Sequence, residues 1–144
     1  ITYNNIEFTR TANGLWQFEY LNRLFVVRYN PEETKDVIFD FAYPISNLYN
    51  KPLYYVTDDE SAGNIQEIIQ NIAPFASRSQ EVCLSGKECR NPDLVEKSCS
   101  DNIIIMHNSE EIKTYKEENC VSIEAPLNNQ LIVSDALIFN LLGI

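Results

Sequence analysis

The chain has 144 residues, of which 44% are hydrophobic and 22% charged, a composition typical of a globular protein and not of a disordered or fibrous one. This length predicts a single α/β domain over residues 1–144. The net charge of −10, with Lys and Arg scattered along the chain, excludes the basic surface that nucleic acids and anionic membranes require. We therefore expect no nucleic-acid partner, and membrane contact only through an anchor outside this sequence.

Aromatic and β-branched residues fill segments 15–20 and 24–29, which predicts a β-hairpin. Asn30, Pro31 and two following glutamates are typical of a helix N-terminus. Apolar residues at helical spacing after them predict a first helix that ends before Pro44.

Segment 53–57 predicts a short buried strand, and Asp58 to Ser61 then provide capping and first-turn residues for a second helix. Isoleucines at helical spacing over 65–72 mark the buried stripe of this helix, which Pro74 ends. A loop that contains three of the four cysteines is expected at about 77–100.

Segment 103–106 is the most apolar strand of the chain, and 112–115 and 120–125 predict an antiparallel hairpin. Segment 131–142 predicts a final helix with Gly143 after its last turn. This helix is apolar on nearly every side, so it lies either inside the core, which we favour, or against a protein partner or a second copy of the chain.

The element order predicts an α/β fold with a mixed β-sheet: a β-hairpin, then β-α-β-α-β, then an antiparallel hairpin and the C-terminal helix. Parallel strands would form the centre of the sheet and the two hairpins would add antiparallel strands, which gives a layered α/β sandwich.

The four cysteines, Cys83, Cys89, Cys99 and Cys120, have neither the paired spacing of a zinc site nor a C-x-x-C redox motif. Structural disulfides are the favoured interpretation, and the favoured pairs are Cys83–Cys89 and Cys99–Cys120 among three possible connectivities. Because disulfides persist in oxidising compartments, we expect an extracytoplasmic location, at the cell surface or secreted.

Polar side chains follow the expected parallel strands at their carboxyl ends, where open α/β sheets bind ligands. They are Asn30, Asp58, Asp59, Glu60 and His107. If the two strands that precede them are parallel, Asp58, Asp59, Glu60 and His107 share one rim and could hold a divalent cation or exchange protons. The stronger interpretation is structural, because acidic residues at helix starts and polar residues at strand ends are ordinary caps and turns.

No P-loop, G-x-G-x-x-G or G-x-S-x-G motif is present, so the sequence assigns no catalytic residue, cofactor or metal. Four segments carry a resemblance instead: CLSGKEC at 83–89, CSDNIII at 99–105, ENCVSIE at 118–124 and SDALIFNLLGI at 134–144. They are similar to a family of archaeal membrane-anchored proteins, and the resemblance implies an N-terminal transmembrane anchor and an outward-facing, disulfide-containing α/β domain.

Three functions follow as hypotheses. We favour an extracytoplasmic, membrane-tethered interaction or structural domain. The first alternative is an enzyme or a divalent-cation-binding domain that uses the rim around Asp58, Asp59 and His107. The second alternative is a thiol–disulfide exchange protein.

Overall fold

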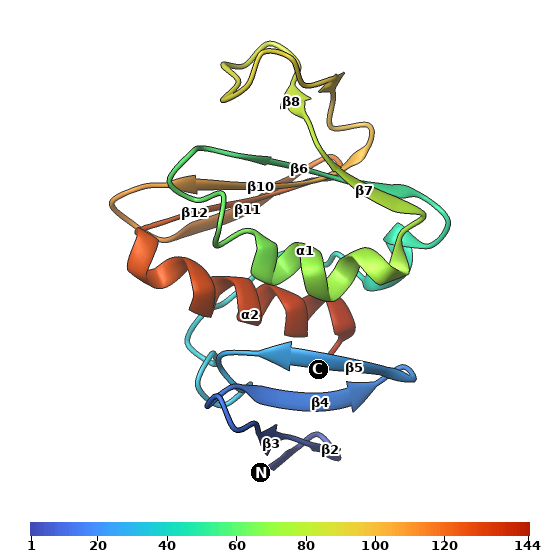
Figure 1. Cartoon of the computed structure of the whole chain (residues 1–144), viewed down its shortest axis with the longest axis vertical. Coiled ribbons are helices and arrows are strands. Elements are labelled where there is room, and N and C mark those ends of the chain that lie inside the picture. Colours follow the sequence, from blue (N-terminus) through green and yellow to red (C-terminus); the bar gives the residue numbers. More distant parts are fainter.

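Two β-sheets enclose a layer of two α-helices, as Figure 1 shows for the computed structural model of residues 1–144. The larger sheet, called here the main sheet, has the strand order β11-β12-β10-β6-β7, and the small sheet has the order β3-β4-β5. The main sheet contains β6 (Pro52–Thr57), β7 (Arg78–Glu81), β10 (Asn102–Asn108), β11 (Lys113–Glu117) and β12 (Cys120–Ala125). The small sheet contains β3 (Thr9–Arg10), β4 (Trp16–Tyr20) and β5 (Arg23–Val27).

The main sheet is mixed: β7, β6, β10 and β12 run parallel, and β11 closes one edge as an antiparallel strand. Its central strand β10 is buried on both faces, which explains the unbroken run of apolar residues at 103–106. The predicted α/β fold with a mixed sheet and a C-terminal helix is confirmed.

The N-terminal hairpin is confirmed as β4 and β5, joined by a two-residue turn at Leu21 and Asn22. Both turn residues have positive φ angles, 51° and 61°, which matches the twist of a tight hairpin. The hairpin does not extend the main sheet, as the sequence had suggested, but forms the small sheet with β3. A shorter hairpin of β1 (Thr2–Tyr3) and β2 (Ile6–Glu7) precedes it.

Two helices form the middle layer, α1 (Gln66–Ile72) and α2 (Gln130–Leu142). Short 3-10 turns adjoin them, η2 (Ala73–Phe75) after α1 and η3 (Leu127–Asn129) before α2. Helix α1 begins later than the capping residues at 58–61 suggested, and the isoleucine stripe faces the core as predicted. Neither helix combines the length and the hydrophobicity that crossing a membrane requires.

Helix α2 lies between the two sheets, so it is buried on nearly all sides (Figure 1). Its residues Leu137 and Ile138 are fully buried, and Phe139 packs against Phe8 and Phe18 from the small sheet side. The core location that we favoured for this helix is therefore confirmed. Each such side chain contributes about 1.5–3 kcal/mol when it is buried, so α2 stabilises both sheets at once. Gly143 ends the helix with a φ of 75°, as predicted.

The predicted helix between Asn30 and Pro44 is wrong. Its capping residues do form the expected reciprocal pair: Glu33 N–H donates to Asn30 Oδ1, and Asn30 N–H donates to Glu33 Oε1, both at 2.9 Å. The helix stops after this turn because the following residues alternate in burial, with Val37 and Phe39 packed against the core and Ile38 78% exposed. In an extended chain every second side chain points to the same side, so alternating burial indicates extended backbone. This extended segment links the two sheets.

The expected loop at about 77–100 contains three short strands, the edge strand β7 and the pair β8 (Cys83–Leu84) and β9 (Glu96–Lys97). Strand β7 is polar throughout, so hydrophobic periodicity gave no signal for it.

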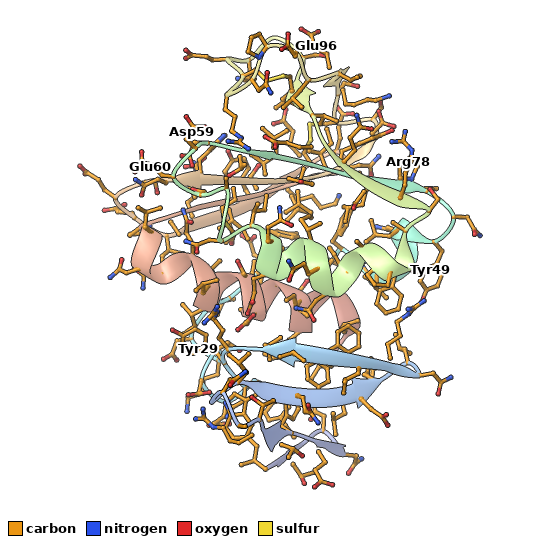
Figure 2. All side chains as sticks on the ribbon, viewed as in Figure 1. Tyr29, Tyr49, Asp59, Glu60, Arg78 and Glu96 are labelled. Atoms are coloured by element: carbon orange, nitrogen blue, oxygen red, sulfur yellow. A yellow bond between two sulfur atoms is a disulfide. The ribbon has the colours of Figure 1, made fainter.

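One further 3-10 turn, η1 (Ile45–Leu48), leads into β6. The side chains in Figure 2 place Asp59 and Glu60 at one end of the main sheet and Arg78 at the opposite end.

Candidate functional site

The main sheet has two buried faces of different size. The face toward the helices belongs to a core of 24 buried residues that includes side chains from both sheets and both helices. The opposite face has no helix over it (Figure 1) and carries a smaller cluster. That cluster contains Tyr54, Val56, Val82, Ile103, Ile105 and Cys120.

Residues 83–99 fold over this second face, and we call them the roof loop. Strands β8 and β9 pair in parallel within it, and Leu84 packs against the small cluster below. Two disulfides hold the roof loop: Cys83–Cys89 inside it, and Cys99–Cys120, which fastens its end to the first residue of β12. These are the pairs that the spacing favoured, with Cα–Cα distances of 5.4 and 5.1 Å.

Tyr54 is the aromatic contact between the sheet and the roof loop. The Nζ of Lys97, from β9, lies 5.1 Å from the centre of the Tyr54 ring, and the Arg78 guanidinium lies 5.3 Å from it. Arg78 also donates a hydrogen bond to the Tyr54 hydroxyl at 2.9 Å. Of these two cations only Lys97 belongs to the roof loop, so its cation–π contact connects the roof loop to the sheet.

A cleft of about 590 Å³ lies between the roof loop and the sheet. Its apolar lining comes from Val56, Val82, Leu84 and Ile105, and its uncharged polar lining includes Thr57, His107, Tyr115 and Ser122. Five carboxylates line it, from Asp58, Asp59, Glu81, Glu88 and Glu117, against two basic side chains, from Lys87 and Arg90. The cleft therefore combines an apolar floor with a negatively charged rim.

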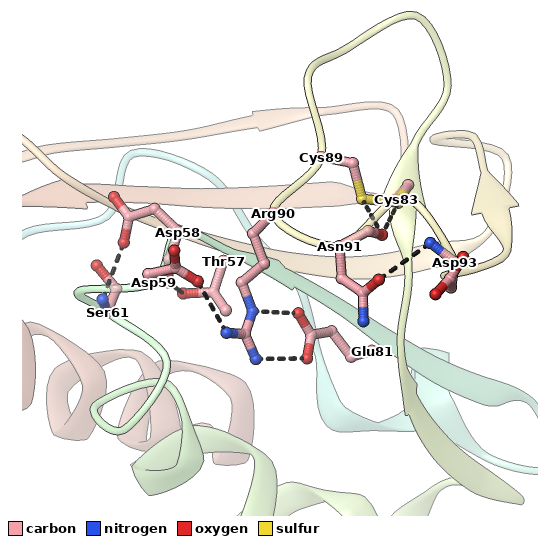
Figure 3. A network of polar contacts seen from close by, with 10 residues as sticks. All are labelled: Thr57, Asp58, Asp59, Ser61, Glu81, Cys83, Cys89, Arg90, Asn91 and Asp93. Atoms are coloured by element: carbon pink, nitrogen blue, oxygen red, sulfur yellow. Dashed lines mark hydrogen bonds and ion pairs between the residues drawn. A yellow bond between two sulfur atoms is a disulfide. The ribbon is translucent and has the colours of Figure 1, made fainter.

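Arg90 connects the roof loop to the rim of the sheet (Figure 3). Its guanidinium donates two hydrogen bonds to the Glu81 carboxylate, at 2.7 and 3.1 Å, and one to Asp59 Oδ1 at 3.0 Å. These hydrogen bonds to Glu81 and Asp59 raise the pKa of Arg90 above its already high ordinary value. Arg90 is thus a permanently charged bridge, and it is the one contact of this kind between the roof loop and the carboxyl end of β6.

Asp58 joins the two loops that follow β6 and β10. Its Oδ1 accepts the Ser61 N–H at 2.9 Å, and its Oδ2 accepts the Asn108 N–H at 2.8 Å. Partial burial works to raise the pKa of Asp58, but the hydrogen bonds from Ser61 and Asn108 and the nearby His107 outweigh it, and the pKa is lowered. Both carboxylate oxygens of Asp58 thus accept backbone hydrogen bonds, which agrees with the structural interpretation of this residue.

The structure brings most of the predicted rim together. Strands β6 and β10 are parallel, with Met106 opposite Thr57, so the residues that follow them, Asp58 and His107, meet at one edge. Asp58, Asp59 and His107 all line the cleft. Glu60 does not line it and accepts a hydrogen bond from the Asn108 side chain instead, at 3.0 Å.

Asn30 does not belong to this rim. It follows β5 in the small sheet, where it is buried and forms the capping pair with Glu33. The expectation that Asn30 lies at the shared edge depended on placing the N-terminal hairpin in the main sheet.

Sequence reasoning missed the polar side chains that β11 and β12 bring to the cleft. The Tyr115 hydroxyl donates to Glu124 Oε2 at 2.7 Å, and Ser122 lies opposite Tyr115 in the antiparallel register. The hydrogen bond to Glu124, together with burial, raises the pKa of Tyr115, so this hydroxyl stays protonated and acts as a hydrogen-bond donor. Alternation along the predicted hairpin could have placed these side chains on one face, but not on the face under the roof loop.

His107 lines the cleft beside Asp58, whose pKa it helps to lower. No group of three or more His, Cys, Asp or Glu side chains is placed to hold a metal ion, so the geometry gives no support to a cation site at the rim.

Comparisons of this chain with models of protein families, with curated proteins and with solved structures found no match. The two disulfides of the roof loop indicate folding in an oxidising environment.

We expect the two disulfides to stabilise the fold unequally. Removing Cys99–Cys120 as the double variant C99A/C120A should lower the free energy of unfolding by about 3.5 kcal/mol, because it opens the longer loop. The variant C83A/C89A should lose about 2 kcal/mol on the same argument. Urea denaturation of the wild type and both variants measures the difference.

Equal losses, or a larger loss for C83A/C89A, would contradict this ranking. Mass spectrometry of the folded wild type under a mild reductant completes the test. A bridge that opens while the fold persists would favour thiol–disulfide exchange over a purely structural role.

The variant Asp58→Asn should lose about 1 kcal/mol at pH 7, because an amide replaces one of two hydrogen-bond-accepting oxygens with a donor. Since the folded pKa of Asp58 is lowered, its contribution is present above the unfolded pKa, ordinarily 3.8, and is lost as the pH falls through the folded pKa. The stability gap between wild type and variant should therefore close in acid. Asp40→Asn, at an exposed position, is the matched control and should show no gap at either pH.

Proposed function

We propose that this chain is an extracytoplasmic, membrane-tethered binding domain without catalytic activity, and that its ligand occupies the cleft under the roof loop. The observation that carries the proposal is the construction of the cleft. One face of the main sheet is left without a helix, and a loop held by two disulfides covers it while leaving about 590 Å³ open. Pockets of this size, partly apolar and with a few polar groups, are the usual form of a ligand site.

The rigidity of the cleft supports a binding role. The roof loop is attached at Cys99–Cys120, shortened internally by Cys83–Cys89 and tied to the rim by Arg90. A site that is already shaped loses little conformational entropy when its ligand binds, so a small cleft can bind with useful affinity.

The charge of the cleft supports a positively charged ligand. Five acidic against two basic side chains line it, and Arg90 already satisfies Glu81 and part of Asp59. Glu117 and Glu88 are exposed and make no ion pair within the chain. The net charge of −10 attracts cations to the whole molecule. The apolar floor beside these carboxylates fits the aliphatic stem of a Lys or Arg side chain from a basic segment of a partner protein.

The ligand proposal predicts binding of hexalysine and hexaarginine in the cleft, with hexaglutamate as the charge-reversed probe. In titrations of the isotope-labelled domain, the amide resonances of Arg90, His107 and Glu117 should shift with the basic peptides and not with hexaglutamate. The variant Glu117→Gln should weaken binding by about 1 kcal/mol, roughly fivefold in Kd.

Glu19→Gln is the matched control, since Glu19 is exposed on β4 in the small sheet and its loss changes the net charge by the same amount. Equal effects of both variants, or shifts spread over all acidic surfaces, would contradict a specific site and indicate general attraction. Shifts in the cleft with hexaglutamate alone would overturn the ligand class and leave the cleft as the binding site.

The location is a separate part of the proposal, supported by the disulfides and by the resemblance to archaeal membrane-anchored proteins. We expect the full-length native protein to sediment with the membranes of its own cells and to be cleaved by protease added to intact cells. Both cysteine pairs should be oxidised in the recovered domain. Recovery of the protein from the soluble lysate with four free thiols would overturn both the location and the tether.

A further inference from the structure

The free edge of β5 is completed by side chains of the helices and not by another strand. The Asn71 side chain of α1 donates to the Val26 carbonyl at 3.1 Å and accepts the Val26 N–H at 3.4 Å. Beyond it, Asp135 of α2 accepts the N–H groups of both Arg28 and Tyr29 through Oδ2, each at 2.9 Å. Figure 2 shows Tyr29 where the small sheet meets the helix layer. We call this contact the joint.

Asp135 is fully buried at the joint, and its second oxygen has no partner. Its exposed fraction is 0%, and Oδ1 makes no hydrogen bond, whereas Oδ2 takes both backbone donors. A buried carboxylate oxygen without a donor is costly in the charged form, and a proton on that oxygen removes most of the cost.

A second carboxylate lies at the joint. Glu67 Oε2 accepts the same Arg28 N–H as Asp135 Oδ2, at 3.3 Å, so the two carboxyl groups meet at one donor. The neighbouring Glu67 carboxyl group adds to the cost that burial places on a charged Asp135.

We propose that Asp135, buried beside Glu67, keeps its carboxyl proton at neutral pH, and that this protonated side chain holds the small sheet on the helices. The joint is then a pH-linked contact that stabilises the fold most in acid and progressively less as the pH rises.

The charged groups around the pair agree with this assignment. From α1 only Glu67 faces Asp135, and from the chain after β5 the single cation is Arg28, whose Nε is 4.0 Å from Glu67 and whose side chain is mostly exposed. Arg28 thus offsets the negative charge of Glu67 only weakly. Burial, followed by the contact with Glu67, raises the pKa of Asp135 to about 10, against the lowering effect of the Tyr29 and Arg28 N–H groups.

The raised pKa of Asp135 determines how the stability of the fold changes with pH. Below the unfolded value of 3.8 both states carry the proton and the stabilisation is complete. As the pH rises from there through about 10, the unfolded state ionises first, and stability is lost.

The test compares wild type with Asp135→Asn, in which the amide keeps the shape of the carboxyl group and does not titrate. Between pH 5 and pH 8, the ratio of folded to unfolded wild type should fall by at least about tenfold relative to the variant. Glu67→Gln should reduce the pH dependence without abolishing it, because burial of Asp135 remains, and the exposed Glu110→Gln is the matched control that should run parallel to wild type.

A direct measurement covers the case in which Asp135→Asn fails to fold. The carboxyl carbon resonance of Asp135 in the wild type should titrate above pH 8, and the amide shifts of Arg28 and Tyr29 should follow the same midpoint. Titration of Asp135 below about pH 5, or parallel pH profiles for wild type and Asp135→Asn, would overturn the proposal that Asp135 keeps its proton.

Discussion

Helix α2 carries apolar side chains on nearly every side, and the rest of the architecture depends on burying them. A helix with one apolar face needs one partner layer, whereas a helix that is apolar all round needs a layer on each side. The main sheet covers one side of α2 and the small sheet covers the other, with Phe8 and Phe18 against Phe139. Helix α1 lies beside α2 in the same layer, so both helices are used on one face of the main sheet (Figure 1).

The opposite face of the main sheet is then left to be covered by other means. Tyr54, Ile103 and Ile105 point to that face, and burying them requires a segment that has little hydrophobic surface of its own. The roof loop is such a segment, since its residues between Ser85 and Ser98 are mostly polar or charged. Disulfides stabilise this loop in place of hydrophobic packing, because they restrict the unfolded chain and hold the loop without a large apolar contact. A cover held at a few points leaves space beneath it, and that space is the cleft.

Three polar side chains in this protein connect separate layers or segments of the fold. Asp58 ties the ends of β6 and β10, Arg90 ties the roof loop to the rim, and Asp135 ties the small sheet to α2. Two of these groups are carboxylates whose pKa values move in opposite directions. Both accept two backbone N–H groups, but Asp58 is only partly buried and its pKa is lowered, whereas full burial, followed by the neighbouring Glu67, raises the pKa of Asp135. The extent of burial, set against the same number of backbone donors, therefore decides the sign.

The sequence by itself determined the α/β class, the N-terminal hairpin, the stripe of α1, the burial of α2 and the favoured cysteine pairs, because local periodicity and spacing carry that information. It also placed Asp58 and His107 at one edge, since Asp58 follows β6 and His107 lies near the carboxyl end of the parallel strand β10. It failed where local signals and packing disagree: the Asn30 capping pair forms, yet packing of Val37 and Phe39 extends the chain beyond it. Only the tertiary structure decided that the N-terminal hairpin forms its own sheet, that Arg90 and Tyr115 reach the cleft, and that Glu67 meets Asp135. These contacts join residues far apart in the chain, and their geometry depends on how whole layers pack.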